Sequence, residues 1–391
     1  MPTSRAAARR RLNEWLEHAW RNGWLPRPML DPEALIAKAQ RRVPAEPQDH
    51  AWRERLGILA SDLASTAALT PLGQTIAHGQ LVASVEQRFR AQALWRNHPQ
   101  ILDIPIEQPI LIVGQMRSGT TRMQRLLATD PRLTHTRFYE SWRPVPSLPI
   151  DDRRARAVVA LLGLRWLNPG FTAIHPTGAG QPDEEFGLHN LSLFGATFEA
   201  QWRVPTFAAH CETADTGPIY REFKALLQTL AWLRGGAANR PWVLKLPQFT
   251  QDLPALLEVF PDARLVCLHR DPAAVVASSA SLVRNQMELQ SNSVDPHWIG
   301  REWLRKTALR DRRARAALTQ TRVPQVDVEY AAMESDWRAE MGRVYAMLGL
   351  PFTALTQDRM ARVLSRRRPP HRYSLSEFGL TEQVVAEASA A

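Results

Sequence analysis

The sequence predicts an α/β protein with a phosphate-loop-like nucleotide fold, in which helices flank a central parallel sheet. From residue 109 onward, short apolar segments alternate with segments of helical spacing, as in sheets that helices cover on both faces. The first apolar segment leads into a glycine-containing loop that opens a helix, which is typical of an anion-binding loop. We expect a helical N-terminal subdomain over residues 1–100 and the α/β domain over residues 101–391.

The individual elements follow from the spacing of apolar residues. Leu12, Trp15 and Leu16 show helical spacing within the first hundred residues. Residues 144–218 are rich in Pro, Gly and His, and we expect this irregular segment to carry ligand contacts, because such connections often do. Strands are predicted at residues 110–113, 242–245, 264–268 and 325–330, and helices at residues 121–129, 219–233, 253–259, 272–283, 297–319 and 335–348.

Basic side chains are in excess, with 49 Lys and Arg against 39 Asp and Glu and a net charge of +10. Focused in a cleft, this charge would concentrate an anionic ligand, although a basic surface without a ligand gives the same count. A nucleic-acid-binding protein is disfavoured because no helix-turn-helix, zinc or RNA-binding signature accompanies the charge. In the basic helix at residues 301–315, acidic neighbours favour a solvated face over a surface for an anionic acceptor or a membrane.

The two cysteines, Cys211 and Cys267, are too few for a disulfide framework and lack the spacing of a zinc site. This cysteine usage is typical of a reducing cytosol. The basic N-terminus is not followed by the apolar core of a signal peptide, and no window reaches the ~20 apolar residues of a membrane helix. We expect a cytoplasmic protein without a transmembrane segment; attachment to a membrane surface stays open.

The most informative segment is the loop at residues 114–121, which reads Gly-Gln-Met-Arg-Ser-Gly-Thr-Thr. Its glycine spacing is that of the nucleotide-binding phosphate loop, but Thr120 stands where that loop has its lysine. Arg117, three residues earlier, restores a cation near a bound oxyanion. Because a kinase or ATPase uses the loop lysine on its nucleotide phosphates, the substitution disfavours ordinary triphosphate chemistry.

With this loop, the sequence resembles the sulfotransferase family that uses 3′-phosphoadenosine 5′-phosphosulfate (PAPS). The matching segments are residues 117–121, 243–247 and 260–272, and the resemblance extends from residue 109 to about residue 375. It is greatest to a bacterial branch that also resembles tyrosylprotein sulfotransferases. The resemblance implies transfer of a sulfuryl group from PAPS to a hydroxyl or amine, in a sulfotransferase domain at residues 101–391 and without a metal.

The resemblance also implies which residues hold the donor. Arg270 and Ser278 match the pair that grips the 3′-phosphate of PAPS. Arg270 follows a predicted strand, at the edge where open parallel sheets bind ligands, and Ser278 lies about two turns along the next helix. The loop residues expected at the donor are Arg117, Ser118, Gly119, Thr120 and Thr121.

Sulfuryl transfer needs a base for the acceptor and positive charge near the breaking bond. Arg117 and Lys245 match family residues that supply the charge. Glu140 lies in a segment resembling the one that holds a catalytic glutamate in the tyrosylprotein branch, and it is our first candidate for the base. The acidic segment 183–185 with His189 is the alternative; Glu185 and His189, four residues apart, would then form a pair, although such pairs are usually surface contacts.

Near the C-terminus, residues 366–375 form a basic run that includes Arg372. Such runs are usually solvated tails, but a similar segment in this bacterial branch makes Arg372 a candidate for closing over the donor phosphates. Two other functions stay open: a P-loop-type kinase or ATPase, and a non-catalytic nucleotide-binding protein of the same fold. The acceptor is expected to be a small molecule, a lipid or a sugar. The sequence does not identify which, because function resides in the site and not in the fold.

Overall fold

The centre of the molecule is a five-stranded parallel sheet with the strand order β2-β3-β1-β4-β5. The computed structural model describes residues 3–44, 50–147, 150–174, 177–236, 240–365 and 373–390. In the central strand, Ile112 is in register with Lys245 on one side and with Val266 on the other. The parallel sheet expected from the sequence is confirmed. The strands are β1 (Ile110–Gly114), β2 (Thr134–His135), β3 (Trp242–Lys245), β4 (Arg264–His269) and β5 (Gln325–Glu329).

Both faces of the sheet are covered, and alternate residues of each strand point to opposite sides. Leu111 and Val113 join one apolar core, with α12 (Gly217–Leu233) and α13 (Leu253–Val259). Ile110 and Ile112 join the other. That second core is completed by α5 (Thr120–Leu127), α17 (Trp337–Met347) and α18 (Ala354–Leu364).

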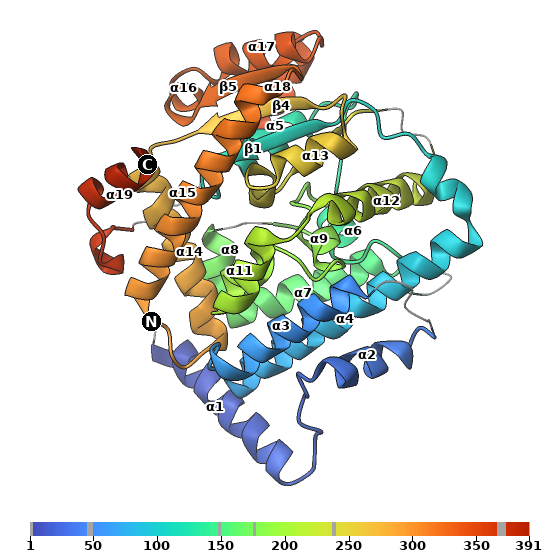
Figure 1. The fold of residues 1–391 in the computed structure, drawn as a ribbon, viewed down its shortest axis with the longest axis vertical. Coiled ribbons are helices and arrows are strands. Elements are labelled where there is room, and N and C mark those ends of the chain that lie inside the picture. Colours follow the sequence, from blue (N-terminus) through green and yellow to red (C-terminus); the bar gives the residue numbers. More distant parts are fainter. Residues whose placement is uncertain are drawn as a thin grey trace.

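A helical layer lies at the end of the molecule opposite the sheet (Figure 1). Trp52 and Phe89 from the N-terminal helices share one apolar core with Phe198 and Phe207. The layer therefore combines the first hundred residues with part of the segment 144–218, whose sequence pattern is weak. Its helices are α1 (Thr3–Arg21), α2 (Pro32–Gln40), α3 (Ala51–Ser65), α4 (Pro71–Asn97), α10 (Ala196–Gln201) and α11 (Pro205–Thr213).

The remaining helices lie around the sheet and between it and this layer (Figure 1). Asp271 caps α14, because its carboxylate accepts a hydrogen bond from the Ala274 amide at 2.9 Å. Within the described residues, no helix combines the length and the apolarity needed to cross a bilayer. These helices are α6 (Phe138–Trp142), α7 (Arg153–Leu167), α8 (Pro169–Ile174), α9 (Phe186–Asn190), α14 (Pro272–Gln290), α15 (Pro296–Gln320), α16 (Tyr330–Ser335) and α19 (Glu382–Ala390), with short 3-10 turns η1 (Pro99–Asp103), η2 (Pro247–Thr250) and η3 (Ser376–Phe378).

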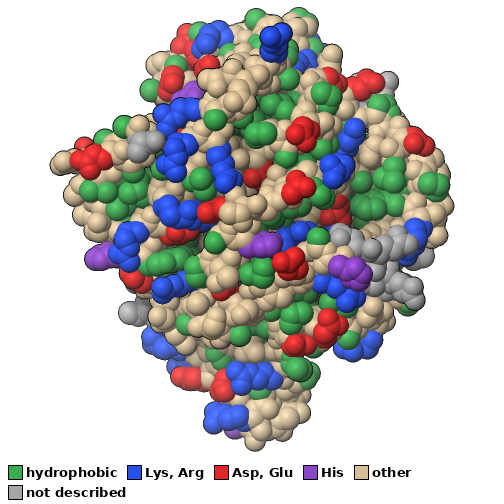
Figure 2. All heavy atoms as spheres, viewed as in Figure 1, with side chains coloured by type: hydrophobic (Ala, Val, Ile, Leu, Met, Phe, Trp, Pro, Cys, Tyr) green, Lys and Arg blue, Asp and Glu red, His purple; other side chains and the backbone are tan. Residues whose placement is uncertain are grey.

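Positive charge is not gathered into one patch on the face drawn in Figure 2, where Lys and Arg side chains are interspersed with Asp and Glu. On α15, Arg305 pairs with Glu302 and Glu212, each at 2.7 Å. This is the arrangement of a solvated, charge-balanced face. Lys306 differs, because it is buried and pairs with Glu199 at 2.6 Å, so part of this basic helix serves the interior.

Candidate active site

The loop between β1 and α5 has an unusual backbone. Arg117 has φ +72°, a left-handed conformation that non-glycine residues rarely adopt. Gly119 has φ +98°, and a Cβ atom there would lie 3.0 Å from the Tyr330 ring. The Ser118 hydroxyl closes the loop by donating to the Gln115 carbonyl at 2.7 Å. The loop is thus held in a defined shape at the carboxyl end of the central strand.

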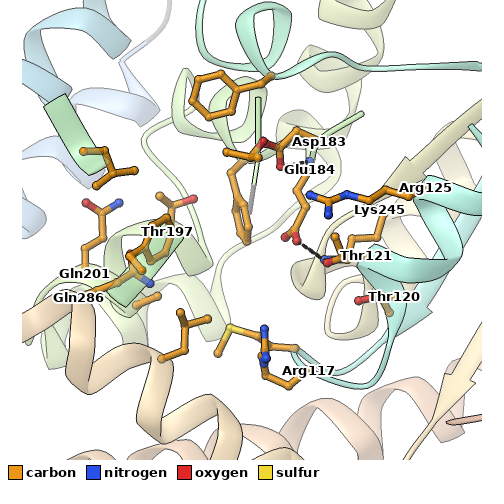
Figure 3. Close-up of a pocket in the computed structure, with 18 of the residues that line it drawn as sticks. Arg117, Thr120, Thr121, Arg125, Asp183, Glu184, Thr197, Gln201, Lys245 and Gln286 are labelled. Carbon is orange, nitrogen blue, oxygen red and sulfur yellow. Dashed lines mark hydrogen bonds and ion pairs between the residues drawn. The ribbon is translucent and has the colours of Figure 1, made fainter. Parts of the chain in front are cut away.

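A cavity of about 1150 Å³ opens beside this loop. Figure 3 shows Arg117, Thr120 and Thr121 at its loop end, with Lys245 and Glu184 next to them. Thr197, Gln201 and Gln286 lie on the other side in the same view. The apolar part of the wall is formed by Ile76, Met116, Phe138, Trp142, Ala160, Leu164, Leu167, Phe171, Phe186, Ala200, Leu282, Leu289, Trp337, Val363 and Leu364.

Arg117, Ser278 and Arg270 meet at the loop end of the cavity. The Arg117 Nε donates to the Ser278 hydroxyl at 3.1 Å, and Arg270 donates to the Arg117 carbonyl at 2.8 Å. Arg270 also donates to the Tyr373 hydroxyl at 3.1 Å and lies over the Tyr330 ring. Burial lowers the pKa of Arg117, and the nearby charge of Arg270 lowers it further. An anion bound between the two guanidinium groups would offset both effects.

Lys245 ends β3 and carries its ammonium group into the wall of the cavity. It forms an ion pair with Glu184 and donates to the Thr121 hydroxyl at 3.2 Å. The Thr121 hydroxyl in turn donates to Glu184 at 3.1 Å. The side chains of Lys245 and Glu184 are almost fully buried, yet both line the cavity. A cation, a carboxylate and a hydroxyl are therefore joined directly beside the phosphate loop.

The acidic segment 183–185 and His189 divide between the cavity and the core. Asp183 lines the cavity, as Glu184 does. Glu185 is buried; its carboxylate accepts from the Lys245 amide at 2.7 Å, and burial raises its pKa. Burial lowers the pKa of His189 to about 3, so its ring is neutral, and it packs against Tyr220. The ring Nε2 of His189 has no hydrogen-bond partner among the described residues, so this side chain belongs to the core and not to an acid–base pair.

Glu140 is buried in α6 and does not line the cavity. Its carboxylate accepts from the Arg137 amide at 2.9 Å and from the Arg234 Nε at 3.0 Å, with a second, shorter contact to the Arg234 Nη2. Arg234 also donates to the Thr134 hydroxyl and the His135 carbonyl, each at 2.9 Å. These bonds tie α6 to the edge strand β2. Glu140 thus lies behind the cavity wall, whereas Asp183 and Glu184 of the acidic segment line it.

Two further observations concern residues at the margins of the site. Arg372 lies outside the described residues; Tyr373, which follows it, bonds Arg270. The cavity side of α7 was missed in the sequence, although Ala160, Leu164 and Leu167 lie at helical spacing. That signal lies within a segment whose Pro and Gly content favoured an irregular structure.

Residues 109–354, more than half of the chain, match the sulfotransferase family. The chain belongs to the sulfotransferase family. The sulfotransferase STF1 from Mycobacterium tuberculosis has a similar structure, with a TM-score of 0.81 and 27% identity over 93% of this chain and 99% of that one. The sulfotransferase STF9 from Mycobacterium avium gives a TM-score of 0.78 and 27% identity over 92% and 94% of the two chains.

Sequence relatives of this sulfotransferase-family chain include the omega-hydroxy-beta-dihydromenaquinone-9 sulfotransferases Stf3 of Mycobacterium bovis and Mycobacterium tuberculosis. They are 29% identical over 185 residues, and the match spans 45% of this chain and 45% of each relative. The chain thus covers less than half the length of these curated relatives. The predicted membership of a bacterial branch of the PAPS-type family is confirmed.

Proposed function

We propose that this protein transfers a sulfuryl group from PAPS to a hydroxyl on an apolar acceptor. The observation that carries the proposal is the contact of Lys245 with Glu184 and Thr121, beside the phosphate loop and at one end of a largely apolar cavity. The family supplies the donor, because its members typically use PAPS. The apolar cavity wall indicates an apolar acceptor.

The residues at the loop fit a donor that carries phosphate at two positions. Arg117, with the backbone amides at the start of α5, suits the 5′-phosphate, because helix N-termini attract anions. Arg270 and the Ser278 hydroxyl, linked through Arg117, suit the 3′-phosphate. Ser118, Gly119, Thr120 and Thr121 complete the loop. PAPS when bound supplies the sulfuryl group; the protein supplies orientation and charge.

Glu184 is proposed as the group that takes the proton from the acceptor hydroxyl, with Asp183 as its neighbour on the cavity wall. It replaces Glu140 in this role. Lys245 stabilises negative charge on the leaving phosphate oxygen, and Arg117 shares it. A donor phosphate beside Lys245 would compete with Glu184 for the ammonium group and so free a carboxylate oxygen to act as a base.

The acceptor is proposed to be a lipid-like alcohol, since most of the wall away from the loop is apolar. That the Stf3 relatives are named for a hydroxylated menaquinone supports this class. No metal is needed in this scheme, because Arg117 and Lys245 provide the positive charge. A cytoplasmic location agrees with Cys211 and Cys267, which are buried and unpaired.

The test compares two nucleotides by calorimetry and then measures turnover. Adenosine 3′,5′-bisphosphate should bind at least about tenfold more tightly than ADP, or about 1.4 kcal/mol. Transfer from labelled PAPS to a panel of apolar alcohols should continue in EDTA. Equal affinities would overturn the donor assignment. Activity lost in EDTA and restored by magnesium would favour a kinase, and a selective bisphosphate site without any turnover would favour a non-catalytic binding protein.

A further inference from the structure

We propose that the outer face of α7 docks on an anionic phospholipid bilayer, so that a membrane-resident acceptor enters the cavity whose wall the same helix forms. The inference rests on the apolar acceptor of the proposed function. It adds a docking surface on α7, an anionic bilayer as the partner, and a path by which the acceptor reaches the cavity. Three features of α7 carry it: an exposed apolar face, a second face in the cavity, and exposed positive charge.

The first feature is a row of large apolar side chains on the surface. Val158, Leu162 and Trp166 follow one another at intervals of four residues and are 45%, 58% and 64% exposed; Val159 beside them is 70% exposed. Residues four apart lie on the same face of a helix. Single exposed apolar residues are ordinary, but a contiguous row on one helix marks an interaction surface.

The second feature is that α7 is also apolar where it lines the cavity. Ala160, Gly163, Leu164 and Leu167 form part of the cavity wall. A third side, with Ala157 and Leu161, packs in the cluster that contains Tyr139. Apolar side chains of α7 therefore face the surface, the cavity and the protein core, which is a wider apolar surface than a helix with a single core-facing stripe presents. Among the described residues, protein covers the side of α7 with Ala157 and Leu161, whereas Val158, Leu162 and Trp166 are exposed.

The third feature is charge. Arg154, Arg156 and Arg165 on α7 are exposed, and the helix itself contains no acidic residue. Asp151 and Asp152, just before it, pair with Arg153 and Arg156. Arginines around an apolar face that includes tryptophan are typical of helices that lie in the headgroup region of anionic membranes. A second copy seated on the same face would place arginines opposite arginines, which disfavours self-association.

The experiment measures cosedimentation of the full chain with vesicles. We expect binding to vesicles of phosphatidylglycerol and phosphatidylcholine, weaker binding in high salt, and little binding to phosphatidylcholine alone. The double variant Leu162→Ser with Trp166→Ser should bind about tenfold less. The matched control is Leu355→Ser on α18, whose side chain is 59% exposed and which should bind as the unmodified chain does.

Binding of adenosine 3′,5′-bisphosphate to both variants checks their folding and should not change, because none of the three substituted positions lines the cavity. Absence of vesicle binding by the unmodified chain, or equal loss in the Leu355 control, would overturn the proposal. A dimer in ultracentrifugation that only the α7 variant dissolves, without vesicle binding, would assign the face to a second copy instead. Vesicle binding is measured without turnover, so its failure is distinct from a failure of the proposed reaction.

Discussion

Two buried glutamates, each paired with a cation, lie close together and differ in what surrounds them. The Glu140 carboxylate is held by Arg234 and by the Arg137 amide, and it does not line the cavity. The Glu184 carboxylate is held by Lys245 and Thr121, and it does. The two segments touch, because the Ser141 hydroxyl donates to the Glu184 carbonyl at 2.8 Å.

The comparison teaches that a buried charge does not by itself indicate catalysis. Arg234 binds Glu140 as well as the Thr134 hydroxyl and the His135 carbonyl of β2. This pair therefore fastens a helix to the edge of the sheet. Lys245 and Glu184 instead line a cavity that a substrate can enter. Removing one partner of a closed pair leaves a buried charge without compensation, whereas a pair on a cavity wall is available for chemistry.

The largest expected effect is on turnover by Glu184→Gln, which keeps the shape of the side chain and removes its basicity. We expect kcat to fall by about 10²–10⁴ while donor affinity stays within a few-fold. Steady-state transfer from labelled PAPS to a hydroxyl acceptor measures it, corrected for the folded fraction by circular dichroism. A nearly normal Glu184→Gln enzyme beside a folded but inactive Glu140→Gln enzyme would return the role of base to Glu140.

Glu140→Gln should instead lower the free energy of unfolding, by about 3 kcal/mol, because it leaves the Arg234 guanidinium without its carboxylate. Urea denaturation measures this loss, and kcat per folded molecule should stay within a few-fold. Glu288→Gln is the control, since it breaks an exposed pair with Arg284 and should cost less than about 1 kcal/mol. An unchanged stability of Glu140→Gln would refute the structural role.

A smaller expected effect concerns the pH dependence of stability that comes from the buried His189. The pKa of His189 is lowered from 6.5 to about 3 in the folded protein. The unfolded chain therefore binds the extra proton as pH falls below 6.5, and stability is lost in that range. In His189→Phe, which suits the surrounding aromatic rings, the loss of stability between pH 7 and pH 5 should be smaller by about 2 kcal/mol.

Urea denaturation at the two pH values measures the difference, and His135 serves as an internal reference. Burial lowers the pKa of His135 to about 4, so its contribution has the same sign and is present in both proteins. Parallel pH dependences would show that His189 takes up its proton in the folded state. That result would place it at a solvated site.

Much of the fold could be predicted because short apolar segments alternate with segments of helical spacing, which indicates parallel strands covered by helices. The helix Leu253–Val259 was predicted to its end residues, whereas the two-residue strand Thr134–His135 is too short to show a period. The helix predicted at residues 272–283 continues to Gln290. Its last part carries Gln286 and Gln290 towards the cavity, where polar residues interrupt the apolar pattern.

The site was predictable where topology alone brings residues together. Lys245 ends β3 and Arg270 follows β4, the two strands that flank β1. The carboxyl ends of these parallel strands share one edge of the sheet. Glu140 and Glu184 could not be ranked in this way, because their roles depend on partners distant in sequence. Arg234 lies 94 positions from Glu140, and no local spacing predicts that contact.

Helix α14 also sets a length. Ser278 stands at the phosphate end of this helix, and Leu282, Gln286 and Leu289 follow along the cavity wall. Because the helix is continuous from Pro272 to Gln290, the spacing between Ser278 and Leu289 is fixed at about 16 Å by the rise of 1.5 Å per residue. Deleting one residue between them would turn every later side chain by about 100° and shorten the wall. One continuous helix thus fixes the distance between the phosphate loop and the apolar cavity wall at Leu289.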